Sequence, residues 1–169
     1  MVDSLAYTIS LLLKRFDEEN KYTLRNLNYG IKLILTPLII VILSLTIALS
    51  LNTFLETITC ITAILIMRYW TGGRHLKSPE ACIVFSVGIV LLIPYISNTF
   101  QPNLIVTSLI SLALILMFAP FTYKNDAIYT KIIAASFVLI NALFINSNVI
   151  GMAFLVQAID IIKFERLRQ

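Results

Sequence analysis

The chain contains one histidine and two cysteines, and the histidine stands close to one of the cysteines. His75 and Cys82 lie seven residues apart, in the segment RYWTGGRHLKSPEAC that runs from Arg68 to Cys82. A cysteine thiolate is a nucleophile, and a nearby imidazole can accept its proton and later protonate a leaving amine. The pair therefore indicates acyl transfer by a thiol. A loop histidine and a packed thiol without any catalytic role fit the same spacing.

The residues just before Cys82 predict the start of a helix. Ser78 is a good capping residue, Pro79 suits the first helical position, and Glu80 places an acid in the first turn. Cys82 then lies in the first turn, where the positive end of the helix dipole favours a thiolate. A continuous helix from His75 to Cys82 would separate their Cα atoms by about 10.5 Å. We therefore expect a break before Pro79 that lets His75 fold back toward Cys82.

Four further residues are candidates for supporting roles. Gly72 and Gly73 give the loop before His75 conformational freedom. Arg68 either binds a substrate carboxylate or an oxyanion, or marks the end of a membrane segment. Glu80 either orients the imidazole, as a triad acid does, or complements the helix dipole. One histidine and one cysteine cannot complete a zinc site within the chain, so we expect no metal and no other cofactor.

The composition predicts an all-α, polytopic integral membrane helix bundle that forms a single domain over residues 1–169. Hydrophobic residues make up 59% of the chain, charged residues 13%, and the mean hydropathy is +0.90. A soluble domain contains about 25% charged residues. Candidate membrane helices lie at about residues 31–51, 55–70, 80–97, 103–121, 131–146 and 148–163. Cys60, inside the second of these, is expected to be a small buried hydrophobe.

The basic residues predict the orientation of these six segments. All 13 Lys and Arg residues fall before or at the start of the first segment, at the end of the sixth or after it, or in and beside the loops that follow the second and fourth segments. Positive charges are retained on the cytoplasmic side, so we expect six spans in the cell membrane, with both termini and residues 68–82 cytoplasmic. Four spans with a buried C-terminal hairpin give the same sides. The net charge of +4 then reflects this retention and contacts with anionic lipid, and does not indicate nucleic-acid binding.

An arm of polar character, residues 1–28, precedes the bundle of residues 29–169. Within residues 4–19, apolar side chains recur at near-helical spacing, which predicts an amphipathic helix at the membrane interface: Leu5, Ile9, Leu12, Leu13 and Phe16. This helix either anchors the topology or docks an amphipathic substrate peptide.

The pattern Arg68-x-x-x-Gly72-Gly73-x-His75-x-x-x-x-x-x-Cys82 resembles the motif of the accessory gene regulator protein B (AgrB) family. The Tyr29-Gly30 pair at the start of the first span and the length of the chain are also similar to that family. The resemblance implies a membrane cysteine endopeptidase, with Cys82 as nucleophile and His75 as base. Its partner would be an AgrD-like propeptide, a small amphipathic quorum-sensing precursor that is cleaved and closed into a thiolactone or lactone.

Two features depart from the family pattern. The loop from Thr122 to Lys131 is short and holds only two lysines, whereas many members have a longer basic stretch. Arg74 stands where aromatic residues are common. The first departure bears on which propeptide is selected, and it does not touch the residues that would carry the chemistry.

Other classes of function remain open from the sequence. A small transporter subunit would need polar groups deep in the membrane, for which Asn141, Gln157 and Asp160 are the candidates. A non-catalytic membrane scaffold would use the segment from His75 to Cys82 only as a contact. The short spans would be easier to bury in a dimer, so we expect a homodimer.

Overall fold

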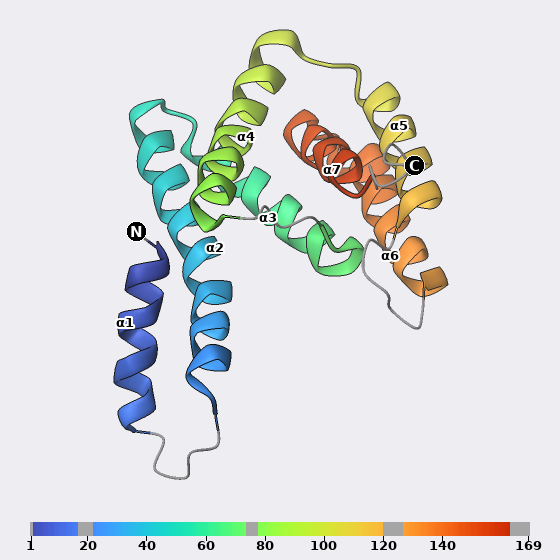
Figure 1. The fold of residues 1–169 in the computed structure, drawn as a ribbon. Helices are drawn as coiled ribbons and strands as arrows, with labels where there is room; N and C mark the ends of the chain where they lie inside the picture. The colour runs from blue at the N-terminus through green and yellow to red at the C-terminus, as the bar shows by residue number, and fades with distance from the viewer. Residues whose placement is uncertain (1, 17–21, 74–77, 120–126, 163–169) are drawn as a thin grey trace, which may run out of the picture. The chain divides into compact units, whose positions relative to one another are not determined.

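The computed structural model describes residues 2–16, 22–73, 78–119 and 127–162. All regular elements in these ranges are helices, which confirms the predicted all-α class (Figure 1). In chain order they are α1 (Val2–Arg15), α2 (Leu24–Ser50), α3 (Phe54–Thr71), α4 (Pro79–Phe100), α5 (Leu104–Phe118), α6 (Ala127–Ile140), a turn of π-helix η1 (Asn141–Ile145), and α7 (Asn148–Asp160).

Each of the six predicted apolar segments coincides with a helix, but the helices differ in length. Within the described residues, four are long and apolar enough to cross a membrane: Leu24–Ser50, Phe54–Thr71, Pro79–Phe100 and Ile128–Ile145. The apolar helices α5 and α7 have only 15 and 13 residues. At 1.5 Å per residue α7 is about 20 Å long, whereas the hydrocarbon core is about 30 Å thick. Six complete spans therefore stay a prediction.

The first long helix starts earlier than the hydropathy pattern predicts. α2 begins at Leu24 rather than near residue 31. Thr23 explains the difference, because its side chain accepts a hydrogen bond from the Asn26 amide at 3.2 Å and its carbonyl accepts one from the Leu27 amide at 3.1 Å. The polar residues at the end of the predicted arm are thus the first turns of this helix.

The described residues within 1–47 and 75–89 form one compact unit. In it α1 presents a line of small buried residues, Val2, Ala6 and Ser10. Asp3 near the start of α1 forms an ion pair with Lys32 of α2. Large apolar residues of α1, among them Leu5, Leu12 and Leu13, remain exposed, as does Phe16 directly after the helix.

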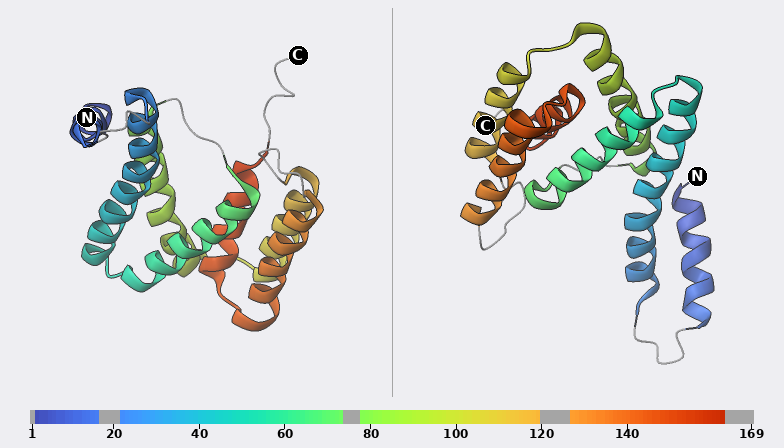
Figure 2. Two further views of the ribbon diagram at one scale, coloured as in Figure 1. Left: turned by 90° about the horizontal axis from the view of Figure 1, so that it is seen from below. Right: turned by 180° about the vertical axis from the view of Figure 1, so that it is seen from behind.

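The described residues within 48–74 and 90–169 form the second unit. Here α7 packs against α3 and α5, and α6 packs against the same two helices (Figure 2). Small residues allow close approach: a Cβ added to Gly151 of α7 would lie 2.7 Å from Leu104 Cδ1 of α5. The packed faces carry Thr107, Ser108 and Ser111 on α5 and Ala153 and Ala158 on α7.

One buried polar residue builds the corner between α6 and α7. The Asn141 side chain donates to the Ser147 carbonyl at 3.1 Å and accepts from the Ser147 amide at 3.2 Å. Asn146 between them adopts a left-handed conformation, with φ 55°, and its amide donates to the Asn141 carbonyl at 2.8 Å. Asn141 thus has a structural role in this corner.

Candidate active site

Cys82 lies in the first turn of α4, as the sequence predicts. The Ser78 hydroxyl accepts a hydrogen bond from the Ala81 amide at 3.2 Å, and the Ser78 carbonyl accepts one from the Cys82 amide at 3.2 Å. Pro79 is the first residue of the helix. Cys82 has a free, half-buried thiol, whereas Cys60 is fully buried in α3. Only Cys82 of the two combines a helix start with partial exposure.

The hydrogen bonds at this helix start determine which backbone amides could donate to the Cys82 sulfur. Ser78 engages the amides of both Ala81 and Cys82, so neither amide is available to the sulfur. What remains is the aligned dipole of the helix, whose positive end lies at this turn and favours negative charge.

Glu80 has a partner that the sequence did not predict. Its Oε1 accepts a hydrogen bond from the Val2 amide, with a donor–acceptor distance of 3.3 Å. Val2 is the first residue of α1, so the carboxylate caps a second helix while standing in the first turn of α4. The two residues are 78 positions apart in the sequence. An acidic residue at a helix start does not predict so distant a partner.

His75 falls in residues 74–77, which lie outside the described residues. Its predicted approach to Cys82 stays a prediction. Within the described part of the chain, no three His, Cys, Asp or Glu side chains gather where they could hold a metal ion.

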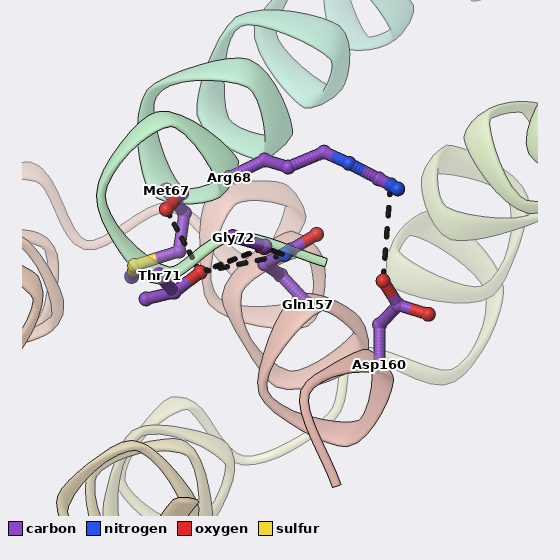
Figure 3. Close-up of polar contacts among 6 residues, drawn as sticks. All are labelled: Met67, Arg68, Thr71, Gly72, Gln157 and Asp160. Carbon is purple, nitrogen blue, oxygen red and sulfur yellow. Dashed lines mark hydrogen bonds and ion pairs between the residues drawn. The ribbon is translucent and has the colours of Figure 1, made fainter. Parts of the chain in front are cut away.

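The remaining candidates, Arg68, Gly72 and Gly73, lie together where α3 ends. Arg68 Nη1 lies 3.8 Å from Asp160 Oδ2 at the end of α7 (Figure 3). Both side chains are partly exposed, at 31% for Arg68 and 21% for Asp160. A pair of this length and exposure contributes little stability on its own, but it gives the Arg68 guanidinium a carboxylate partner within the chain.

Gly72 closes α3 in a backbone conformation that suits glycine. Its φ of 77° and ψ of −161° fall in a region that other L-residues almost never adopt. Its amide donates to the Arg68 carbonyl at 2.9 Å, and its carbonyl accepts from Gln157 Nε2 at 2.7 Å. Gln157 Nε2 also lies 3.4 Å from the Thr71 hydroxyl, which donates to the Met67 carbonyl at 2.9 Å (Figure 3).

At Gly73 the constraint is limited space rather than backbone conformation. A Cβ built on it would lie 2.9 Å from Arg68 Cζ and 2.9 Å from Asp160 Oδ2. The sequence predicts conformational freedom for both glycines. In the structure Gly72 is held by hydrogen bonds and Gly73 lies against the ion pair, so this turn has a defined geometry.

Sequence reasoning missed the part that α7 plays at this turn. Gln157 and Asp160 attracted attention only as polar groups of a conceivable transport path. In the structure they contact the end of α3 instead. Their positions near the end of the apolar segment 148–163 were the available signal, because polar groups in such helices usually face a partner.

Comparison with known proteins identifies the family of this chain. The family model described as Accessory gene regulator B matches residues 3–163 of the 169-residue chain. No curated protein and no solved structure matches the chain significantly. The match includes every candidate site residue from Arg68 to Cys82, and also Gln157 and Asp160. The chain therefore belongs to the accessory gene regulator B (AgrB) family, whose members take part in processing the autoinducer peptide and have an AgrD-type propeptide as partner.

Proposed function

We propose that this protein is a membrane cysteine endopeptidase that cleaves an AgrD-type propeptide and closes the retained fragment into a thiolactone or lactone. Cys82 is the nucleophile and His75 the general base. The observation that carries the proposal is the placement of Cys82, a free and half-buried thiol in the capped first turn of α4, in a chain of the AgrB family.

The first step transfers an acyl group from the propeptide to the enzyme. His75 takes the proton of the Cys82 thiol, and the thiolate attacks the carbonyl carbon of the scissile peptide bond. As the carbon–nitrogen bond breaks, the imidazolium returns the proton to the leaving amine. The C-terminal fragment departs, and the rest of the propeptide is held on Cys82 as a thioester. Proton transfer by a positioned side chain typically accelerates such a step by about 10²–10⁴-fold.

The second step closes the ring. A thiol or hydroxyl of the bound propeptide gives its proton to His75 and attacks the thioester carbonyl, and the Cys82 thiolate leaves. When the attacking group is a thiol, one thioester replaces another, so the acyl group keeps its reactivity. Excluding water and holding the internal nucleophile close to the carbonyl favour ring closure over hydrolysis. The positive end of the α4 dipole assists because it stabilises the departing thiolate.

The site lies on the cytoplasmic side in this proposal, as the distribution of basic residues predicts. Six spans and cytoplasmic termini are part of the proposal, and α1 would lie at the same interface as the amphipathic propeptide. The exposed Leu5, Leu12 and Leu13 of α1 support that placement, because an interfacial helix needs an apolar face directed toward lipid. A homodimer would bury the flanks of the short helices, and crosslinking in native membranes tests this.

The transporter hypothesis loses its main candidates in the structure. Asn141 holds the Ser147 corner, Gln157 binds the Gly72 carbonyl, and Asp160 pairs with Arg68. Each of the three polar residues has a structural partner, so none is needed for a path across the membrane.

The test is cleavage of the propeptide encoded beside the gene, co-expressed with the full-length protein and analysed by mass spectrometry. We expect release of the C-terminal fragment by the wild-type protein and no release by Cys82→Ala or His75→Ala. Cys60→Ala is the matched control, because it removes the other thiol, which is fully buried, and should leave cleavage intact.

Two results would contradict the proposal in different ways. Cleavage that persists in Cys82→Ala would exclude the covalent mechanism. No cleavage by the wild-type protein, with the propeptide present and intact, would favour the non-catalytic scaffold.

A further inference from the structure

We infer that the second unit fits a hydrocarbon layer only about 20 Å thick, and that it therefore thins the lipid bilayer around it. The inference concerns only the described residues within 48–74 and 90–169. It goes beyond the proposed function and does not depend on the chemistry proposed for Cys82.

Polar residues bound the apolar stretches of α3 and α5. On α3, Glu56 and Arg68 are twelve residues apart, which corresponds to about 18 Å of helix. On α5 the exposed Asn103 caps the first turn, and Lys131 donates a hydrogen bond to the Leu116 carbonyl at 2.7 Å. Leu116 lies about 20 Å along the helix from Asn103. Charged groups avoid the hydrocarbon, so both helices offer lipid a short apolar length.

The other two helices of this unit have similar limits. On α7 the capping residue Ser147 and the carboxylate of Asp160 are about 20 Å apart. On α6 and η1, the distance from Lys131 to the exposed Asn146 is about 22 Å. A tilted helix covers still less of the membrane thickness, so these lengths are upper limits.

Contacts between the helices bring the polar positions into two layers. Arg68 pairs with Asp160 where α3 and α7 end. A Cβ on Gly151 would lie 2.7 Å from Leu104 Cδ1, so α5 and α7 start together. The first polar layer thus contains Arg68, Asp160 and Lys131, and the second contains Glu56, Asn103, Asn146 and Ser147.

Aromatic residues accompany the first polar layer. Tyr69 is exposed, and its ring packs edge-on against that of Trp70 at a centroid distance of 5.2 Å. Both follow Arg68 directly. Tyr129, two residues before Lys131, is exposed as well. Tyrosine and tryptophan concentrate where a membrane meets water, which identifies this layer as an interface.

Between the two polar layers the unit exposes large apolar side chains. Thr62 and Ser136 are exposed there too, and their hydroxyls donate to carbonyls of their own helices at 2.9 and 2.8 Å. These hydroxyls need no water. The exposed apolar residues are Leu65 and Ile66 on α3, Ile105, Leu109 and Ile110 on α5, and Ile132, Leu139 and Ile140 on α6.

The occupant of these faces is lipid rather than a second copy of the chain. A second copy would cover the sides of helices, but it would not lengthen the stretch between Glu56 and Arg68 or between Asn103 and Lys131. In a hydrocarbon layer of about 30 Å, one polar end of each helix would be immersed. Thinning by about 10 Å brings both ends to the headgroups, and α5 and α7 then cross the layer completely.

The first test varies the thickness of the bilayer. The full-length chain carries Cys82→Ala, so that Cys60 is its only thiol. It is reconstituted into vesicles of dimyristoleoyl, dioleoyl or dierucoyl phosphatidylcholine, whose thickness increases in that order. Cys60 is fully buried, so its alkylation by N-ethylmaleimide on heating reports opening of the second unit. We expect the temperature of half-maximal alkylation to be highest in dimyristoleoyl and lowest in dierucoyl vesicles.

Two variants ask whether the polar layers set this preference. Glu56→Leu extends the apolar stretch of α3 toward its start, so it should narrow the difference between dimyristoleoyl and dioleoyl vesicles. Ser136→Ala is the matched control, because it changes an exposed polar side chain between the layers and moves neither layer. It should leave the differences among the three lipids as they are in the parent protein.

A second measurement locates both layers in dioleoyl vesicles. Trp70 is the only tryptophan of the chain and lies at the first layer. In a Trp70→Phe background, Ile105→Trp places a tryptophan beside the second layer. Both fluorophores should be quenched more by lipids brominated near the headgroup than by lipids brominated at the chain ends. Leu109→Trp in the same background, between the layers, should show the reverse order.

Three results would overturn the inference. The alkylation temperature could be highest in dioleoyl or dierucoyl vesicles, or equal in all three, which would mean that the unit does not require a thin layer. Stronger quenching of Trp70 or of the Ile105→Trp variant by chain-end bromines would show that the bilayer is not thinned. An alkylation temperature that rises with the protein-to-lipid ratio and not with shorter chains would assign the apolar faces to a second copy. Peptide cleavage that persists in Cys82→Ala would refute the proposed function and leave this inference standing.

Discussion

Replacing Gly72 with alanine tests the geometry of the turn most directly. At φ 77° and ψ −161°, alanine would suffer a clash of its Cβ with the backbone, at a cost of about 1–3 kcal/mol. The chain can instead rotate to a permitted conformation. It then gives up the bond from the Gly72 amide to Arg68, 2.9 Å long, and the bond from Gln157 to the Gly72 carbonyl, 2.7 Å long.

Backbone strain and the loss of the two hydrogen bonds both destabilise the native turn at Gly72. A cost of 1–3 kcal/mol corresponds to a shift of about 5- to 150-fold in the population of the native turn. We expect Gly72→Ala to lower the unfolding free energy, measured by detergent titration, by an amount in that range. Fragment release should fall with it. Gly73→Ala should be milder, because its Cβ meets the ends of two side chains that can move aside.

Gly30→Ala is the matched control. Gly30 lies within α2, and an added Cβ would have nothing within 4 Å. In a helix interior this substitution should stabilise by about 0.5–1 kcal/mol. If Gly72→Ala proves as well tolerated as Gly30→Ala, both in unfolding and in fragment release, the assigned strain and the role of the turn are wrong.

Two further predictions concern other contacts. Glu80→Gln should loosen the start of α1, because the Val2 amide loses a charged acceptor, and limited proteolysis there should be faster. Fragment release should fall only modestly. A complete loss of fragment release with α1 still protected would instead support the triad-acid role of Glu80. Gly151→Ala should destabilise the packing of α5 and α7 by about 1–3 kcal/mol, because the new Cβ would lie 2.7 Å from Leu104 Cδ1. Adding Leu104→Ala should restore part of the lost stability. Purely additive losses of stability on thermal unfolding would speak against this contact.

The sequence predicted the elements of the fold better than their contacts. Each apolar run became a helix because burial of apolar side chains and internal backbone hydrogen bonding favour the helix in lipid. The helix start at Pro79 followed from capping chemistry that acts within four residues. The start of α2 was predicted too late, because Thr23 caps a polar first turn that hydropathy does not register.

The contacts of the candidate site depend on distant parts of the chain. Gln157 lies 85 residues from Gly72, and Val2 lies 78 residues from Glu80. Local propensities carry no information about such pairs. The spacing of Gly72, Gly73 and His75 indicated a functional segment, yet the separate physical reasons for the two glycines required the backbone angles and the neighbouring α7.

The bond between Gln157 and Thr71 also has a consequence for biosynthesis. Gln157 is made 86 residues after Thr71, which at about 5–20 residues per second takes about 4–17 s. During that interval the Gly72 carbonyl lacks its α7 donor, although α3 has already been synthesised. The turn can reach its final geometry only once the last helix has joined α3 and α5. A chain that ends before α7 would thus lack the donor that completes the turn after α3, so this turn is among the last parts of the protein to form during synthesis.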